Sequence, residues 1–435
     1  MAVYGGLATP VAVLINAALV AYLALFPAVF ALIIRRLAIT YGRRALLAAP
    51  LVWVATELGR TYIITGFPWV LLGYSQTSVL PIAQFASLFG VYGVSALVAA
   101  MSAAIAAFAT SPATVGGYAR IRPLLVTTVL IAGVAAWGGQ RLAGNELTHS
   151  GEAIRVGMIQ GNVDQAEKMG LQRSAEIFQD YLGKTRQAIQ RGAAFVLWPE
   201  SSTPFIFEED QIGAASLRML ARQARVPILF GSDQVERGTP NRWFNSAFLV
   251  GPDGAVGGVY RKIHLVPFGE YVPLQRLLFF AAPLTEQVGT FTAGTTANLL
   301  PVQGHPVSVS ICYEVVYPAL VRQFVTGGSE LLTTITNDAW FGPTSAPYQH
   351  FEQASMRAIE EGRYMVRAAN TGISGIVDPY GRVLARTGVY EPAVLVGEAR
   401  FLRTSTFYAR HGDVLAYVAA VLTAALLVAA RRRVQ

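Results

Sequence analysis

The first 34 residues contain no charged side chain, and this stretch constrains the fold more than any other feature of the chain. A membrane-spanning helix needs about 20 consecutive apolar residues, so the stretch is long enough to cross a bilayer. It lacks the basic start that is typical of a secretory signal peptide. We therefore expect a transmembrane helix near residues 12–34, followed by a short basic loop with Arg35, Arg36, Arg43 and Arg44.

Further apolar stretches predict four more membrane helices, near residues 45–63, 81–109, 123–139 and 414–430. The second helix carries Glu57 and Arg60, which form either a pair at the water interface or a functional polar contact. Residues 66–76 are rich in aromatic residues, Pro and Gly, and we interpret them as an interfacial or re-entrant loop. Hydrophobic residues make up 53% and charged residues 14% of the chain. The charged share is about half of that in soluble proteins, which fits a membrane protein.

Basic loops lie on the cytoplasmic side of bacterial membranes. Loop 35–44, loop 120–122 and the tail 431–433 are basic, so the region 150–412 is expected outside the cytoplasm. The net charge is +8, but many arginines flank apolar runs, and we expect no nucleic-acid partner. The predicted organisation is a transmembrane domain at 1–149, a catalytic domain at 150–412, and a last membrane helix with a basic tail at 413–435.

In the region 150–412 charges are frequent, and short β-like runs alternate with helical segments, which predicts a layered α/β domain. Strands are expected at 154–160, 194–198, 227–231, 244–250, 255–260, 307–311 and 331–336. Two more strands are expected on either side of the turn at 378–381. Helices are expected at 172–191, 212–225 and 350–363, and another begins after Pro318.

Three reactive residues each follow a strand-like run. Cys312 is the only cysteine in the chain and ends the run 307–311, while Glu200 and Lys262 follow the runs 195–197 and 255–260. Taken singly, a cysteine of this kind is more often a small buried hydrophobic residue, and a glutamate or lysine of this kind is more often a solvated loop residue. Together, a carboxylate, an ammonium and a thiol are the parts needed for acyl transfer through a thioester.

Six short motifs around these residues resemble one family. They are WPES at 198–201, HLVPFGEYVP at 264–273, ICYE at 311–314, TNDAWFG at 336–342, TGFPW at 65–69 and GYSQ at 73–76. The chain resembles the nitrilase superfamily and, within it, the membrane-bound apolipoprotein N-acyltransferases. The resemblance covers nearly the whole chain. It implies a nitrilase-like αββα sandwich domain inserted between the helices of an α-helical membrane domain.

The resemblance implies the roles of the site residues. Glu200 would be the general base, Cys312 the nucleophile, and Lys262, with the Tyr313 N–H, would hold the oxyanion. Glu270 would orient Lys262, and Glu314 would support the thiol strand. The residues expected to contact lipid are Trp340, Phe341, Trp69 and Tyr74, with plain core packing as the alternative for the aromatic residues. A pairing of His264 with Cys312 is the weaker alternative to Lys262.

The implied reaction moves an acyl chain from phospholipid to Cys312 and then to the α-amine of a diacylglyceryl lipoprotein. We expect no cofactor, and no metal because no His/Cys ligand spacing occurs. We expect a monomer in the bacterial plasma (inner) membrane with a periplasmic catalytic domain. A membrane-anchored nitrilase-like amidase or hydrolase and an inactive lipid-binding relative remain alternative functions.

Two departures from the family pattern concern lipid access. Family members carry further membrane helices before the helix expected at 12–34, which indicates an incomplete start or a shortened variant. The family often places a tryptophan near residues 165–169, and this chain has none there.

Overall fold

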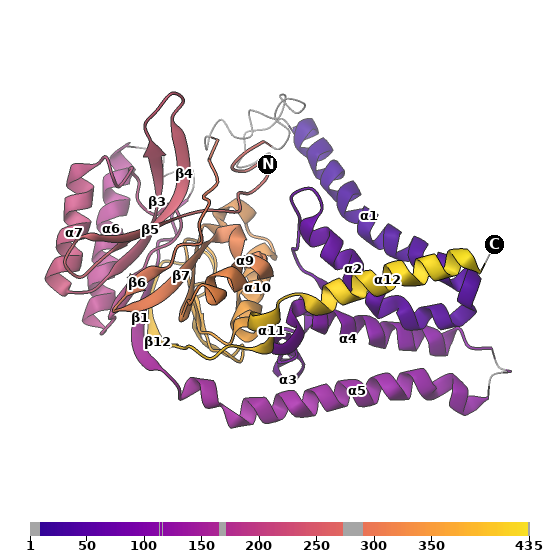
Figure 1. Ribbon diagram of the computed structural model, residues 1–435. Coiled ribbons are helices and arrows are strands. Elements are labelled where there is room, and N and C mark those ends of the chain that lie inside the picture. Colours follow the sequence, from indigo (N-terminus) through magenta and orange to yellow (C-terminus); the bar gives the residue numbers. More distant parts are fainter. Residues whose placement is uncertain (1–8, 113, 115, 165–170, 273–289, 434–435) are drawn as a thin grey trace. The chain divides into compact units, whose positions relative to one another are not determined.

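The computed structural model describes residues 9–112, 114, 116–164, 171–272 and 290–433 (Figure 1). Residues 165–169, where the family tryptophan is absent, lie outside the described residues. From Val13 onward, contacts divide the chain into two compact units. An α/β unit comprises Glu146–Thr404, and a helical unit comprises Val13–Asn145 with Ser405–Gln435.

The first sheet of the α/β unit has six strands in the order β12-β1-β2-β3-β4-β5. Its members are β1 (Glu152–Gln160), β2 (Phe195–Leu197), β3 (Ile228–Glu236), β4 (Arg242–Val250), β5 (Val256–Arg261) and β12 (Ala393–Phe401). The pairs β1–β2 and β2–β3 are parallel, whereas β4, β5 and β12 join antiparallel. The five strands predicted here are confirmed, although β3 runs five residues beyond its predicted end.

The second sheet has the order β11-β10-β9-β8-β7-β6, and its central strands β7, β8 and β9 are parallel. Its members are β6 (Leu300–Val302), β7 (His305–Ile311), β8 (Leu331–Thr336), β9 (Met365–Ala369), β10 (Gly375–Val377) and β11 (Val383–Arg386). Strands β6, β9 and β12 were not predicted. In β9, the charged but buried Arg367 interrupts a short apolar run.

Helices cover the outer face of each sheet (Figure 1). Helices α6 (Leu171–Gln190) and α7 (Gln211–Ala224) pack Leu182 and Leu217 into a core with Phe230 of β3. Helices α9 (Pro318–Thr326) and α10 (Ala346–Glu361) lie on the second sheet.

The inner faces of the two sheets are in close contact. A Cβ added at Gly397 of β12 would lie 2.7 Å from Ile376 Cδ1 of β10. The α/β unit therefore has the four-layer αββα architecture of nitrilases, with sheet on sheet at its centre.

The helical unit contains α1 (Thr9–Tyr41), α2 (Ala49–Tyr62), α3 (Leu80–Ala83), α4 (Ala86–Ala109), α5 (Gly117–Gly144), α11 (Phe407–His411) and α12 (Val414–Arg432). Within the described residues, four helical segments are long and apolar enough to cross a membrane, with α1 and α2 counted as one. The basic loop predicted from residue 35 was wrong in part, because α1 continues through Arg35 and Arg36 to Tyr41.

The helix predicted at 81–109 is interrupted within its first turns. Residues 84 and 85 separate α3 from α4, and Gly90 has a φ of +64° inside α4. A side chain at Gly90 would meet the Tyr408 ring at 2.5 Å, so both the backbone conformation and the packing require glycine here.

Loop 66–76 is held by the two charged residues of α2. Glu57 Oε1 accepts a hydrogen bond from the Leu72 N–H at 2.7 Å, and Arg60 donates to the Trp69 carbonyl at 2.9 Å. Of the two predicted alternatives, a pair at the water interface does not describe Glu57, whose side chain is buried. Both residues fix the backbone of the aromatic loop instead.

Candidate active site

The three reactive residues follow the carboxyl ends of three strands. Glu200 follows β2 and Lys262 follows β5 in the first sheet, whereas Cys312 follows β7 in the second sheet. In α/β sheets, side chains at these strand ends meet above the sheet edge. All three are buried, and the charges of Glu200 and Lys262 act on the pKa of the Cys312 thiol.

Lys262 lies between two carboxylates. Its Nζ is 2.9 Å from Glu270 Oε1 and 3.3 Å from Glu200 Oε1, and its side chain is 1% exposed. Burial by itself would lower the pKa of Lys262, but the charges of Glu270 and Glu200 raise it above its ordinary value. Lys262 is therefore a charged ammonium, anchored on both sides.

Asn245 of β4 completes this cluster, and the sequence had not indicated it. Its Nδ2 donates to Glu200 Oε1 at 2.7 Å and to Glu270 Oε1 at 2.8 Å. The other Glu200 oxygen accepts from the Asn337 N–H at 2.9 Å, and the other Glu270 oxygen accepts from the Val266 N–H at 2.8 Å. Both carboxylates are thus fixed at each oxygen, which limits their movement during a reaction.

Cys312 occupies an unusual backbone conformation. Its φ is +53°, in the left-handed region that a residue with a Cβ rarely adopts, at the point where β7 turns into the short helix η6 (Cys312–Val316). Burial and the Glu200 carboxylate raise the pKa of the Cys312 thiol, while Lys262 acts in the opposite direction. The resting residue is a neutral thiol, so attack on a substrate requires a base to remove its proton.

Glu314 supports the strand end that carries Cys312. Its Oε1 accepts from Tyr260 Oη at 2.8 Å, the Ile263 N–H at 2.6 Å and the His264 N–H at 3.0 Å, and its Oε2 accepts from the Ile311 N–H at 2.7 Å. Burial raises the pKa of Glu314 to about 7, against the effect of these donors. The side chain ties the end of β5 to the end of β7.

Glu314→Gln should therefore destabilise the α/β unit. The amide has one acceptor oxygen and places N–H groups against backbone donors, and a buried donor without an acceptor costs about 1–3 kcal/mol. We expect a lower midpoint of thermal unfolding than for Glu352→Gln, the same change at an exposed position of α10. Equal midpoints for the two variants would contradict this structural role.

The remaining predicted residues occupy different environments. In the α/β unit, Trp340 is 38% exposed and Phe341 packs edge-on against His350. The His264 ring lies against the Tyr317 ring at a tilt of 39°, with ring centroids 3.7 Å apart, and burial and Lys262 lower the pKa of His264 to about 4. In the helical unit, Trp69 is half-buried and Tyr74 is 3% exposed. Neutral His264 faces an aromatic side chain.

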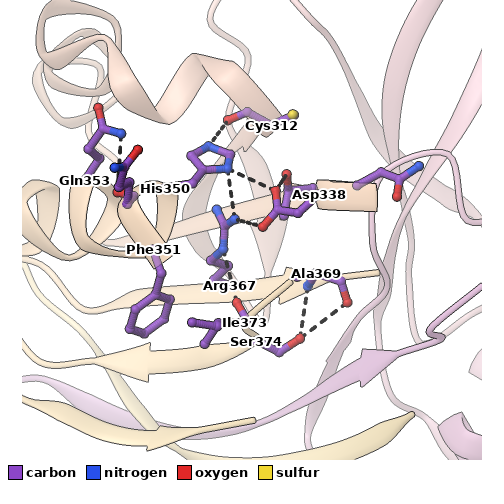
Figure 2. Close-up of polar contacts among 12 residues, drawn as sticks. Cys312, Asp338, His350, Phe351, Gln353, Arg367, Ala369, Ile373 and Ser374 are labelled. Atoms are coloured by element: carbon purple, nitrogen blue, oxygen red, sulfur yellow. Dashed lines mark hydrogen bonds and ion pairs between the residues drawn. The ribbon is translucent and has the colours of Figure 1, made fainter. Parts of the chain in front are cut away.

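Figure 2 shows a second polar cluster, joined to the carbonyl group of Cys312, that the sequence had not indicated. It comprises Asp338, His350 and Arg367, which come from η7 (Asp338–Phe341), α10 and β9. Asp338 belongs to the family motif at 336–342, and this motif was the one sequence feature that could have indicated the cluster.

Comparison with known proteins identifies both parts of the chain. The carbon-nitrogen hydrolase family model matches residues 155–405, and the apolipoprotein N-acyltransferase N-terminal domain model matches residues 1–104. The apolipoprotein N-acyltransferase of Geobacter metallireducens is 39% identical over 439 residues, which cover 99% of this chain and 82% of that relative. The enzyme of the same name from Bradyrhizobium diazoefficiens is 37% identical over 448 residues, with 98% and 80% covered.

Among solved structures, an amidase from Nesterenkonia sp. has a TM-score of 0.45 and 22% identity, and the match covers 58% of this chain and 93% of the amidase.

Proposed function

The chain belongs to the apolipoprotein N-acyltransferase family, and on that premise we propose that it N-acylates bacterial lipoproteins through a thioester on Cys312. The observation that carries the proposal is the buried ammonium of Lys262 between Glu200 and Glu270, close to the single thiol of the chain. This arrangement supports a Glu200–Lys262–Cys312 triad in which a base, an oxyanion-stabilising cation and a nucleophile are already assembled.

The first step forms the thioester. Glu200 accepts the proton of the Cys312 thiol while Sγ attacks the ester carbonyl carbon of a phospholipid. Lys262 has three N–H groups; two are directed at Glu200 and Glu270, and we assign the third to the developing oxyanion, together with the N–H of Tyr313. When the ester C–O bond breaks, the leaving lysophospholipid oxygen takes the proton from Glu200.

The second step forms the amide. The α-amine of the diacylglyceryl cysteine at the lipoprotein N-terminus attacks the thioester carbonyl, and the same donors stabilise the second tetrahedral intermediate. Glu200 removes a proton from the amine and returns it to the departing Cys312 sulfur. Water must be kept from the thioester, because hydrolysis would release a fatty acid instead of the amide.

The helices support a membrane location for this chemistry. Both substrates carry acyl chains, and the part of the chain that the structure describes has four segments long and apolar enough to span a bilayer. We assign the protein to the bacterial plasma membrane, as a monomer with domains at 1–149, 150–412 and 413–435. We propose that Trp340 and Phe341 in the α/β unit, and Trp69 in the helical unit, each contact acyl chains of the substrates. Tyr74, which is 3% exposed, would act through packing within the helical unit.

A membrane-anchored hydrolase is the second candidate, because the carbon-nitrogen hydrolase model matches more than half of the chain. It would use the same three residues with water as acceptor. The two functions differ in the fate of the thioester.

The test uses purified full-length protein with phospholipid vesicles and a synthetic diacylated lipopeptide. Mass spectrometry should detect a lipopeptide heavier by one acyl chain and an equal amount of lysophospholipid. Free fatty acid in place of the triacylated lipopeptide would support the hydrolase. If neither the triacylated lipopeptide nor free fatty acid formed, both functions would be overturned.

The basic segments predict the orientation of the α/β unit, which a cysteine-labelling experiment can check. Gly238 lies at the exposed tip between β3 and β4, and Gly117 begins α5 on the proposed cytoplasmic side. Added side chains would meet only Pro240 at the first position and nothing within 4 Å at the second. Gly238→Cys should react with a membrane-impermeant maleimide in spheroplasts, and Gly117→Cys only after lysis.

The native thiol gives little background in this experiment, because Cys312 is buried. The reverse labelling pattern would place the catalytic domain in the cytoplasm and contradict the proposed orientation.

A further inference from the structure

We propose that His350, held by Asp338 and Arg367, is a positioning residue that fixes the Cys312–Tyr313 peptide group for catalysis. The inference rests on the proposed function, since it concerns the same nucleophile. It assigns a task to three buried residues that the triad does not use.

The contact that carries the inference joins His350 to the backbone of Cys312. His350 Nε2 lies 3.1 Å from the Cys312 carbonyl oxygen. A carbonyl oxygen can only accept a hydrogen bond, so Nε2 must carry the proton and donate it. Figure 2 shows the sulfur of Cys312 pointing away from the His350 ring. His350 therefore does not act as the base for the thiol.

The imidazole is fixed at its other nitrogen as well. His350 Nδ1 lies 3.0 Å from Asp338 Oδ1 and 3.0 Å from the Arg367 guanidinium, which is itself 2.7 Å from Asp338 Oδ2. All three side chains are buried. Burial and Arg367 lower the pKa of His350, and Arg367 lowers the pKa of Asp338 despite its burial. With its proton on Nε2, the neutral imidazole accepts a hydrogen bond from Arg367 at Nδ1, and Arg367 also pairs with Asp338 Oδ2, so the ring has little freedom to rotate.

The Asp338 carboxylate is also held by Thr336, whose hydroxyl donates to Asp338 Oδ1 at 2.8 Å.

Such anchoring is needed because the backbone at Cys312 is strained. A non-glycine residue in the left-handed region costs on the order of 1–3 kcal/mol and persists only when its surroundings hold it. The hydrogen bond from His350 acts on the first carbonyl group after β7, where the chain leaves the sheet.

The planarity of the peptide group gives this hydrogen bond a catalytic consequence. In a trans peptide, the C=O of Cys312 and the N–H of Tyr313 lie in one plane and point in opposite directions. Fixing the carbonyl on His350 therefore fixes the direction of the Tyr313 N–H, the backbone donor proposed for the oxyanion. The hydrogen bond also polarises this peptide group and strengthens its N–H as a donor.

Two variants of His350 separate this role from simple packing. In His350→Gln, the side-chain amide nitrogen can occupy the position of Nε2 and donate to Cys312. In His350→Asn, the amide reaches only the position of Nδ1, beside Asp338. We expect the rate constant of thioester formation to fall about tenfold or more in His350→Asn, with an unchanged KM for phospholipid, and to stay within a few-fold of wild type in His350→Gln.

The single cysteine allows a direct readout of the hydrogen bond. Protein grown with cysteine labelled with ¹³C at its carbonyl carbon has one labelled peptide group, that of Cys312. Its isotope-edited infrared band should move to higher wavenumber in His350→Asn and remain near the wild-type position in His350→Gln. His305→Asn, at the opposite end of β7, is the matched control and should leave the band unchanged.

The infrared band does not depend on turnover, so failure of this inference is distinguishable from failure of the proposed function. An unmoved band in His350→Asn, or equal acylation rates in the two His350 variants, would overturn the positioning role. If His350→Asn does not fold, Arg367→Gln provides a second test, because it removes the contact to His350 Nδ1 without touching Cys312. This variant should shift the band in the same direction and lower the acylation rate, both by a smaller amount. An unchanged band and rate in Arg367→Gln would then overturn it.

Discussion

Cys312→Ala is expected to abolish both the covalent acyl adduct and lipopeptide acylation while the protein still folds. Wild-type protein incubated with phospholipid alone should gain the mass of one acyl chain, and neutral hydroxylamine should release it, as it does a thioester. Addition of the lipopeptide should discharge the adduct, because the amine consumes it in the second step. No other residue of the chain is a thiol, so none can replace Cys312.

Cys312→Ser tests the chemistry of sulfur at constant size. A hydroxyl group forms its anion far less readily than a thiol, so this variant should be nearly as inactive as Cys312→Ala. Intact mass spectrometry and thermal unfolding should be measured on the same samples. If Cys312→Ala transferred acyl chains as fast as wild type, the thioester mechanism would be wrong.

Lys262→Arg is expected to lower kcat/KM by roughly 10²-fold or more, the loss typical of an oxyanion donor. The ammonium of Lys262 is buried between Glu200 and Glu270 at 3.3 and 2.9 Å. A guanidinium keeps the charge but is larger and planar, and it cannot direct single N–H groups to both carboxylates and an oxyanion from one point. Turnover should be measured at saturating and at limiting concentrations of phospholipid and of lipopeptide.

Lys184→Arg is the matched control for this substitution. Lys184 pairs with Asp180 within α6, outside the cluster of Glu200, Lys262 and Glu270, and the same change there should leave turnover unchanged. Near-normal activity of Lys262→Arg would exclude Lys262 from the site. A loss of activity together with a loss of folded protein would instead indicate a structural ion pair.

The sequence was sufficient to predict features that depend on local composition. Uncharged stretches revealed the membrane helices, because a charged residue in a bilayer core is costly. Alternating strand-like and helix-like runs revealed most strands of both sheets. Because the carboxyl ends of strands in α/β sheets are where reactive residues gather, the placement of Glu200, Lys262 and Cys312 at strand ends could also be predicted. The family motifs then indicated the αββα architecture.

The tertiary structure alone revealed the partners of these residues. Asn245 gives no local signal, and it bridges Glu200 and Glu270 only because the pairing of β4 and β5 places it beside Lys262. His350 reaches the Cys312 carbonyl across 38 residues of sequence. Arg367 would normally mark an exposed position, yet it is buried against Asp338.

The difference has a physical reason. Whether a segment enters a membrane or forms a strand depends on its own side chains, which the sequence lists in order. Whether a buried polar group finds its partner depends on the register of the sheets and on how the helices cover them. At Cys312, the sequence determined the position of the single thiol and the strand that ends there, and only the packing of α10 and β9 decided which side chains hold its backbone.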